Sequence, residues 1–166
     1  KETANTIKGK LLEEGIDVES QDTKVVATGY GRIAVDYADY VITEITCHAR
    51  GGREFAGNDC AVIDVGGQDT KVIILEDGMV KDFLMNDKCS AGTGKFLEIM
   101  ANRLGVTLQE LFEMADQGTI LPISSLCTVF AESEVINYIG EGKNREDIAA
   151  GVVDSVAAKV AQLAQR

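Results

Sequence analysis

The sequence predicts an α/β protein, and three observations support that fold class. Short β-type runs separated by glycine turns between residues 61 and 85 predict a three-stranded meander. After residue 94, most of the chain has apolar residues at the spacing of an α-helix. The composition of residues 3–14 is also typical of a helix. The 166 residues are 45% hydrophobic, which is enough to fill the core of one ordinary domain.

The first elements are expected to be a helix at residues 3–14 and a short buried strand at Lys24–Thr28. The tetrapeptide Gly29-Tyr30-Gly31-Arg32 follows, and it favours a strand-to-helix turn that ends in a surface arginine. Apolar and small residues at mixed helical spacing predict a helix over Tyr40–Phe55 that stops at Gly57.

The meander is the clearest structural prediction, because turn residues separate each pair of strands. Its strands are expected at Ala61–Val65, Thr70–Leu75 and Met79–Met85. Helices are expected after it, at about Lys95–Leu104, Leu108–Asp116, Val129–Ile139 and Arg145–Gln165. One face of the first of these helices carries four apolar residues, Phe96, Leu97, Met100 and Leu104.

The charge balance excludes some classes of partner. Sixteen basic and 27 acidic residues give a net charge of −11, which repels nucleic acid and anionic membranes. No apolar run approaches the ~20 residues of a membrane span and no signal-like segment opens the chain, so we expect a soluble, cytoplasmic protein. The chain begins at Lys1 in a helical stretch and ends at Arg166 after another, so we expect a fragment.

The strongest chemical motif is the segment DVGGQDTK at Asp64–Lys71, which lies on a strand–turn–strand. Glycines let backbone amides approach a phosphate, and Asp64 at the strand end could hold Mg²⁺ or its water shell. An ordinary glycine hairpin is the alternative, but such a turn has no need of an acid on each side. We therefore predict phosphate and metal binding by Asp64, Gly66, Gly67, Gln68, Asp69 and Lys71.

A second glycine loop, Ala91-Gly92-Thr93-Gly94, opens a predicted helix. Free amides and the positive end of the helix dipole would face an anion placed there, so the loop could close on the same phosphates. Glycine before a helix is common without any ligand, and this motif is weak evidence alone. The candidate residues are Gly92, Thr93 and Gly94.

The four cysteines are widely separated, and their spacing alone does not indicate a metal. Cys89 and Cys127 each precede a predicted helix, where the helix dipole favours the thiolate that ligates metal. Cys47 lies inside a predicted helix and Cys60 leads into a buried strand, so both are expected to be packing residues.

Three other polar residues receive structural interpretations. His48 is the only histidine, so no second imidazole exists to complete a metal site with it. Glu132 and Glu134 stand early in their predicted helix, where we expect them to complement its dipole.

Five strings occur in one order along the chain: Ala27–Arg32 (ATGYGR), Cys47-His48-Ala49, Asp64–Lys71 (DVGGQDTK), Asn86–Gly94 (NDKCSAGTG) and Ser124–Glu134 (SSLCTVFAESE). In these strings the chain resembles the activators of 2-hydroxyacyl-CoA dehydratases, a family related to the ATPase subunits of benzoyl-CoA reductases. The resemblance covers most of residues 22–160.

The resemblance implies the acetate kinase/Hsp70/actin fold, with two RNase H-like domains around a cleft for ATP or ADP and Mg²⁺. It implies a homodimer with one 4Fe-4S cluster at the subunit interface, to which each protomer gives two cysteines. Their positions in the strings correspond to Cys89 and Cys127. Such activators use ATP hydrolysis to drive a one-electron transfer to the dehydratase. Reduced ferredoxin or flavodoxin then reduces the activator again.

The chain also departs from the family pattern. An upstream Asp-x-Gly-Ser phosphate loop and a downstream Gly-Gly adenosine loop are absent, so two of the three nucleotide-contacting loops are missing. The resemblance implies that residues 1–57 are the end of domain I and residues 58–166 most of domain II. The parent protein is then an ATPase coupled to electron transfer, and the fragment itself is expected to be inactive.

Two alternatives stay open. A sugar-kinase-like phosphotransferase of the same fold would need a catalytic acid against a substrate hydroxyl, and it gives Cys89 and Cys127 no special role. A non-catalytic ATP-sensing domain would carry four inert cysteines.

Overall fold

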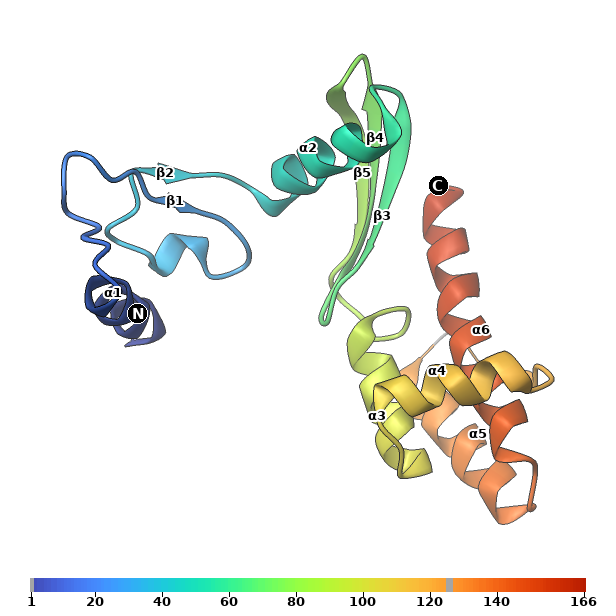
Figure 1. The fold of residues 1–166 in the computed structure, drawn as a ribbon. Coiled ribbons are helices and arrows are strands. Elements are labelled where there is room, and N and C mark those ends of the chain that lie inside the picture. Colours follow the sequence, from blue (N-terminus) through green and yellow to red (C-terminus); the bar gives the residue numbers. More distant parts are fainter. Residues whose placement is uncertain (1, 125–126) are drawn as a thin grey trace. The chain divides into compact units, whose positions relative to one another are not determined.

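The computed structural model describes residues 2–124 and 127–166, and Figure 1 shows their helices and strands in chain order. The chain divides into two compact units, which are described separately. The first unit holds the residues up to Cys60 together with Leu75–Val80, and the second unit holds Ala61–Ile74 and Lys81–Arg166. Ser125 and Leu126, part of the string around Cys127, lie outside the described residues.

The first unit begins with the predicted helix, which is α1 (Glu2–Glu13). The predicted strand at Lys24–Thr28 is present as the two-residue β1 (Val26–Ala27), in which Ala27 is buried and Val26 is exposed. The turn that follows begins at Gly29 with a φ of 81° and leads into a short 3-10 helix, Arg32–Ala34. The half-buried Arg32 side chain donates to the Gly29 carbonyl at 2.9 Å, which closes this turn.

The predicted helix over Tyr40–Phe55 is wrong at its start. Tyr40 and Val41 form a strand, β2, that pairs in parallel with β1. The helix α2 spans Glu44–Ala56, because the Thr43 side chain caps it by accepting the Thr46 N–H at 3.3 Å. It ends at Gly57 as expected, where the φ of 88° suits glycine.

The meander is confirmed as a three-stranded sheet in the order β3-β4-β5, with β3 at Cys60–Val65, β4 at Thr70–Glu76 and β5 at Met79–Asn86. The central strand β4 is the most buried of the three. Along β3 half-buried and exposed residues alternate, with Ile63 and Val65 exposed. The expectation of a buried strand after Cys60 is therefore wrong, because β3 is an edge strand of a small sheet.

Helices fill the rest of the second unit and agree with the sequence prediction: α3 (Gly94–Leu104), α4 (Leu108–Gln117), α5 (Thr128–Gly140) and α6 (Arg145–Ala164). All four residues of the predicted apolar face of α3 are buried. They belong to one cluster with residues of α4, α5 and α6, which is the main hydrophobic core.

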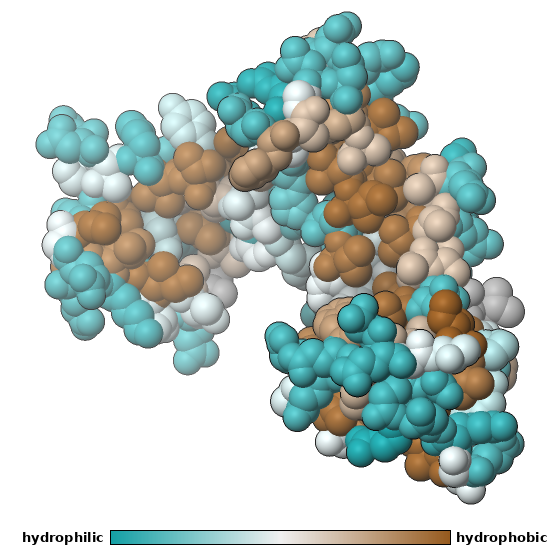
Figure 2. Space-filling view, turned by 45° about the vertical axis from the view of Figure 1, so that its right-hand side comes forward, coloured by the Kyte–Doolittle hydropathy of each residue, from teal (hydrophilic) through white to brown (hydrophobic). Residues whose placement is uncertain are grey.

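Figure 2 shows that apolar side chains also reach the surface. Those of the first unit include Ile7, Leu12, Ile33, Tyr40 and Phe55. Within the described part of the chain, no helix combines the length and apolar character that crossing a bilayer requires.

Candidate functional site

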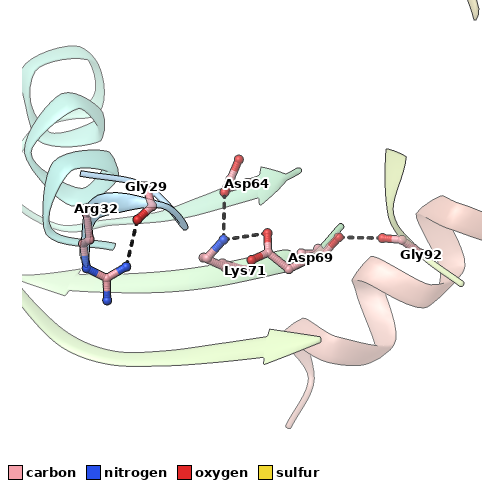
Figure 3. A network of polar contacts seen from close by, with 7 residues as sticks. Gly29, Arg32, Asp64, Asp69, Lys71 and Gly92 are labelled. Atoms are coloured by element: carbon pink, nitrogen blue, oxygen red, sulfur yellow. Dashed lines mark hydrogen bonds and ion pairs between the residues drawn. The ribbon is translucent and has the colours of Figure 1, made fainter. Parts of the chain in front are cut away.

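The segment Asp64–Lys71 surrounds a buried ammonium group. The Lys71 side chain is only 3% exposed, and its Nζ lies 2.7 Å from Asp69 Oδ1 and 3.6 Å from Asp64 Oδ2 (Figure 3). Both carboxylates are about a quarter exposed, at 24% for Asp64 and 23% for Asp69. A ligand that approaches from solvent therefore meets the carboxylates, and Lys71 balances their charge from the interior.

The glycine turn between β3 and β4 presents backbone donors. The Gly66 N–H donates to the Asp69 carbonyl at 2.9 Å, which closes the turn. A Cβ on Gly66 would lie 2.9 Å from Asp69 Oδ1, so only glycine fits without displacement. Gly67 and Gln68 are exposed, and within residues 2–124 and 127–166 neither N–H donates to a protein acceptor. Two consecutive amides of this turn are thus available to an anion.

The two glycine loops contact each other directly. The N–H groups of Gly94 and Lys95, in the first turn of α3, donate to the carbonyls of Gly66 and Gly67, both at 2.8 Å. The expectation that amides at the start of α3 are free for an anion is therefore wrong for these two. A Cβ on Gly94 would lie 3.1 Å from the Gly66 oxygen, so glycine at this position permits the close approach.

The second loop is also fixed to the sheet. The hydroxyl of Thr70, a buried residue of β4, donates to the Gly92 carbonyl at 2.6 Å. Gly92 has a φ of 85°, and a Cβ there would come within 2.6 Å of the Lys159 side chain. Glycine at this position therefore meets both a conformational and a packing requirement.

The segments that carry Cys89 and Cys127 are hydrogen-bonded to each other. The hydroxyl groups of the next residues in the chain, Ser90 and Thr128, lie 2.8 Å apart. Both cysteines are half-buried free thiols, and Cys127 is the N-cap residue of α5. Asn86 stabilises the Cys89 segment, because its Nδ2 donates to the Cys89 carbonyl at 3.0 Å and to the Ala91 carbonyl at 2.9 Å.

A cavity of about 440 Å³ extends from Gly67 and Gln68 of the glycine turn to Cys89. Lys95 lines it with its ammonium 2.9 Å from Glu98, so positive and negative charges meet at the start of α3. The lining residues are Gly67, Gln68, Asp87, Lys88, Cys89, Ser90, Lys95 and Glu98.

The other two cysteines lie in the first unit. Cys47 is half-buried within α2, with its Sγ 3.4 Å from the Thr28 hydroxyl. Cys60 is half-buried at the start of β3, and its Sγ lies 3.7 Å from the Gly57 carbonyl. Across the described residues, no three histidine, cysteine or acidic side chains gather as a metal site.

The interpretation of Glu132 and Glu134 as dipole-complementing charges is wrong. No acidic residue stands in the first turn of α5, and each glutamate has a specific partner. Glu132 forms an ion pair with Arg103 of α3, and Glu134 Oε2 accepts the Ser124 N–H at 2.6 Å. This hydrogen bond fixes the backbone at Ser124, three residues before Cys127. Sequence reasoning also missed the roles of Thr70, Ser90 and Thr128, because a single hydroxyl has no periodic signal.

Two of the solved structures that match this chain share its fold. The structure of component A of the (R)-2-hydroxyglutaryl-CoA dehydratase of Acidaminococcus fermentans has a TM-score of 0.86 and 46% identity, and the match covers 98% of this chain and 63% of that chain. The activator of the 2-hydroxyisocaproyl-CoA dehydratase from Clostridium difficile, with bound ADPNP, has a TM-score of 0.85 and 43% identity, covering 98% and 61%. The chain thus has the α/β fold that the sequence predicts and the actin-like ATPase architecture that the family resemblance implies.

The chain belongs to the BadF/BadG/BcrA/BcrD ATPase family, whose profile matches residues 4–166. It is 52% identical over 143 residues to the activator of lactoyl-CoA dehydratase of Anaerotignum propionicum, which is 85% of this chain and 55% of that protein. It is 47% identical over 165 residues to the uncharacterized protein YjiL of Escherichia coli, covering 99% and 64%. The chain therefore spans between a little over half and just under two thirds of these relatives' length.

Proposed function

We propose that this chain carries the phosphate-binding turn and the cluster-binding cysteines of an ATP-dependent activator. The turn, named the phosphate turn below, is residues 66–69 between β3 and β4. The activator would pass a low-potential electron to a 2-hydroxyacyl-CoA dehydratase or a related CoA-substrate reductase. The observation that carries the proposal is the direct contact between the two glycine loops, which links the phosphate turn to the Cys89 segment and, through Ser90 and Thr128, to the Cys127 segment. Relatives about half identical to this chain are named activators of such dehydratases.

In the proposed nucleotide site, the glycine turn between β3 and β4 would bind the phosphates. The exposed amides of Gly67 and Gln68 are donors of the kind that phosphate oxygens accept. Asp64 and Asp69 would hold Mg²⁺ or its water shell, with Lys71 balancing the charge when no metal is bound. Gly92, Thr93 and Gly94 would shape the loop that lies against this turn. Binding of ADPNP by a solved relative supports a nucleotide site.

Asp64 has the catalytic role in this proposal. Phosphoryl transfer to water depends on positioning and charge stabilisation, so the carboxylate would orient the metal or the attacking water. Its partial exposure of 24% leaves room for that contact, whereas the buried Lys71 is enclosed at 3%.

The cluster half assigns two thiolate ligands, Cys89 and Cys127, to each protomer. A 4Fe-4S cluster takes four cysteine thiolates, so a second copy of the chain would supply the other two and a homodimer is part of the proposal. The two thiols are compatible with cluster binding because both are free and half-buried. Their segments are also connected by the hydrogen bond between the Ser90 and Thr128 hydroxyl groups. When bound, the cluster supplies one-electron transfer, and ferredoxin or flavodoxin would be the electron donor.

The test is iron and sulfide content, with visible absorption, of four variants of the full-length protein purified anaerobically. Cys89→Ser and Cys127→Ser should each lose the cluster almost completely, because one substitution removes two of the dimer's four ligands. Cys47→Ser and Cys60→Ser are the matched controls and should keep their iron, since both thiols lie in the first unit. Iron retained by a Cys89 or Cys127 variant but lost from a control would refute the ligand assignment. A colourless wild-type protein that still phosphorylates a sugar would favour the phosphotransferase.

A further inference from the structure

Helix α3 is capped by the phosphate turn and not by its own N-cap side chain. Thr93 occupies the N-cap position, but its side chain makes no capping bond. Instead the Thr93 hydroxyl donates to the Ser90 carbonyl at 2.7 Å. The amides in the first turn of α3 donate to the carbonyls of Gly66 and Gly67, so the start of the helix depends on how that turn is oriented.

The same peptide groups face the helix on one side and offer donors on the other. The Gly66 carbonyl and the Gly67 N–H belong to one planar peptide unit, and so do the Gly67 carbonyl and the Gln68 N–H. An anion that binds these two N–H groups therefore fixes the orientation of both capping carbonyls. Because hydrogen bonds in a chain polarise one another, it also strengthens the bonds to α3.

The hydrogen bonds continue from α3 to both cysteine segments. Thr93 is fully buried and donates twice to the Ser90 carbonyl, through its hydroxyl and through its N–H at 3.0 Å. The Ser90 hydroxyl then pairs with that of the buried Thr128 at 2.8 Å. Ser90 directly follows Cys89 and Thr128 directly follows Cys127. A buried polar group that loses its hydrogen-bond partner costs free energy. A shift of the turn carbonyls that moves the start of α3 is therefore expected to move Ser90 and Thr128 as well, so that their hydrogen bonds are kept.

We propose that this relay, from the phosphate turn through the start of α3 to Thr93, Ser90 and Thr128, transmits the nucleotide state to Cys89 and Cys127. Ser90 and Thr128 are its positioning residues, since neither is assigned a contact with nucleotide or iron. The inference rests on the proposed function and deepens it, because it identifies how one part of the site regulates the other.

The experiment measures thiol reactivity in the iron-free full-length protein, so that it depends neither on electron transfer nor on nucleotide-binding loops that lie outside residues 1–166. The alkylation rates of Cys89 and Cys127 are followed by mass spectrometry with and without saturating Mg²⁺–ADPNP. In the wild-type protein the nucleotide should change these rates by about fivefold or more, the lower end of typical coupling between sites. In Ser90→Ala and Thr128→Val the ratio of the two rates should fall to near one while ADPNP still binds.

Two controls separate the relay from a merely structural role. Thr128→Ser keeps the hydroxyl and should restore the wild-type ratio. Ser133→Ala removes another hydroxyl of α5, one that donates to the Val129 carbonyl at 3.0 Å outside the relay, and it should leave the ratio unchanged. A variant that is only less stable would keep the nucleotide dependence.

The outcomes distinguish this inference from the proposed function. If wild-type protein binds ADPNP and holds iron, but Ser90→Ala and Thr128→Val keep the full ratio, the relay is wrong and the proposed function stands. The relay also fails if the nucleotide changes no thiol rate in the wild type. If the wild type binds no ADPNP, the proposed function fails and the relay with it.

Discussion

At the residue scale, the two carboxylates beside the glycine turn lie at different distances from Lys71. Asp69 is the closer partner of the buried Lys71, at 2.7 Å, and its carbonyl also accepts the Gly66 N–H. Asp64 lies 3.6 Å from the same ammonium, so it contributes less to holding it. Of the two carboxylates, Asp69 is therefore the one that contributes more to holding Lys71 and the turn.

We predict that Asp64→Asn, made in the full-length protein, abolishes ATP hydrolysis with little change in melting temperature or iron content. The amide keeps the shape of the carboxylate but loses the charge that metal-assisted chemistry needs, while Asp69 still pairs with Lys71. The measurements are Mg²⁺-dependent phosphate release and thermal unfolding.

The matched variant is Asp69→Asn, which removes the nearer charge from a buried ammonium. It should lower the free energy of unfolding by about 1–3 kcal/mol, since a buried polar group is then less well paired. Near-normal ATP turnover in Asp64→Asn would show that this residue is only a strand-end side chain.

Contacts between neighbouring residues of the site could be predicted from the sequence, and contacts between distant residues could not. The contiguous segment Asp64–Lys71 could be recognised because its acids and glycines are neighbours. The pairing of Ser90 with Thr128 joins residues 38 positions apart, and nothing in either local pattern indicates it. The partners of Glu132 and Glu134 were missed for the same reason, and helix position alone gave the wrong explanation.

At the element scale, glycines set how closely α6 packs against the segment that precedes α5. Gly151 is buried in α6, and a Cβ there would overlap the Leu121 carbonyl oxygen. A Cβ on Gly118 would likewise overlap the carbonyl oxygen of Glu146. The Thr119 N–H donates to Asp147 Oδ1 at 2.7 Å, so the contact is polar as well as close.

We predict that Gly151→Ala destabilises the second unit by about 1–3 kcal/mol or more, the usual effect of overpacking. Gly51→Ala is the matched control, because this helical glycine of α2 has nothing within 4 Å of a Cβ. It should be neutral or stabilising by up to about 1 kcal/mol, since alanine favours helix over glycine. Urea unfolding of both variants checks this, and equal effects would contradict the close packing of α6.

The N-terminus of α4 has a capping box that should make its stability depend on pH. The Thr107 side chain accepts the Glu110 N–H at 3.2 Å, and Glu110 Oε2 accepts the Thr107 N–H at 2.7 Å. The backbone hydrogen bond from Thr107, followed by that from its hydroxyl, lowers the pKa of Glu110 below its ordinary value. The folded state thus favours the carboxylate.

We predict that Glu110→Gln lowers stability at neutral pH, and that the difference from wild type shrinks in acid. Because the folded pKa is depressed, the carboxylate contribution is fully present above the unfolded pKa of about 4.3 and is lost as pH falls through the folded pKa. Urea unfolding at neutral pH and well below that value gives the comparison. Glu113→Gln on the same helix is the control, and a pH-independent difference for Glu110→Gln would contradict the prediction.

Elements with a regular apolar period were predictable, and those that depend on distant pairing were not. Helices α3 to α6 follow from their spacing, and the meander follows from its turns. Tyr40 and Val41 were assigned to a helix because local composition cannot reveal their parallel pairing with Val26 and Ala27. The helix start at Glu44 depends on the Thr43 cap, which the spacing of apolar residues did not indicate.

At the scale of the whole molecule, the hydrophobic core is unevenly distributed. The main cluster lies entirely among residues of α3 to α6 in the second unit. Among the described residues, the buried hydrophobics of the first unit are Ala4, Val18, Ala27, Ala49 and Leu75. The predicted domain boundary at residue 57 stays a prediction, since Leu75–Val80 of the sheet groups with the first unit.

The last prediction concerns how evenly this 166-residue chain resists unfolding. We expect amides of α1 and α2 to exchange with deuterium at least about tenfold faster than those of α3 and α6, equivalent to about 1.4 kcal/mol in local opening. Local stability follows buried apolar contact, and α1 and α2 each bury one residue, an alanine, whereas α3 buries five residues and α6 eight. Hydrogen exchange followed by mass spectrometry on peptides from each helix measures this directly. Equal protection in the four helices would show that the chain opens as one cooperative body, in contradiction to its division into two units.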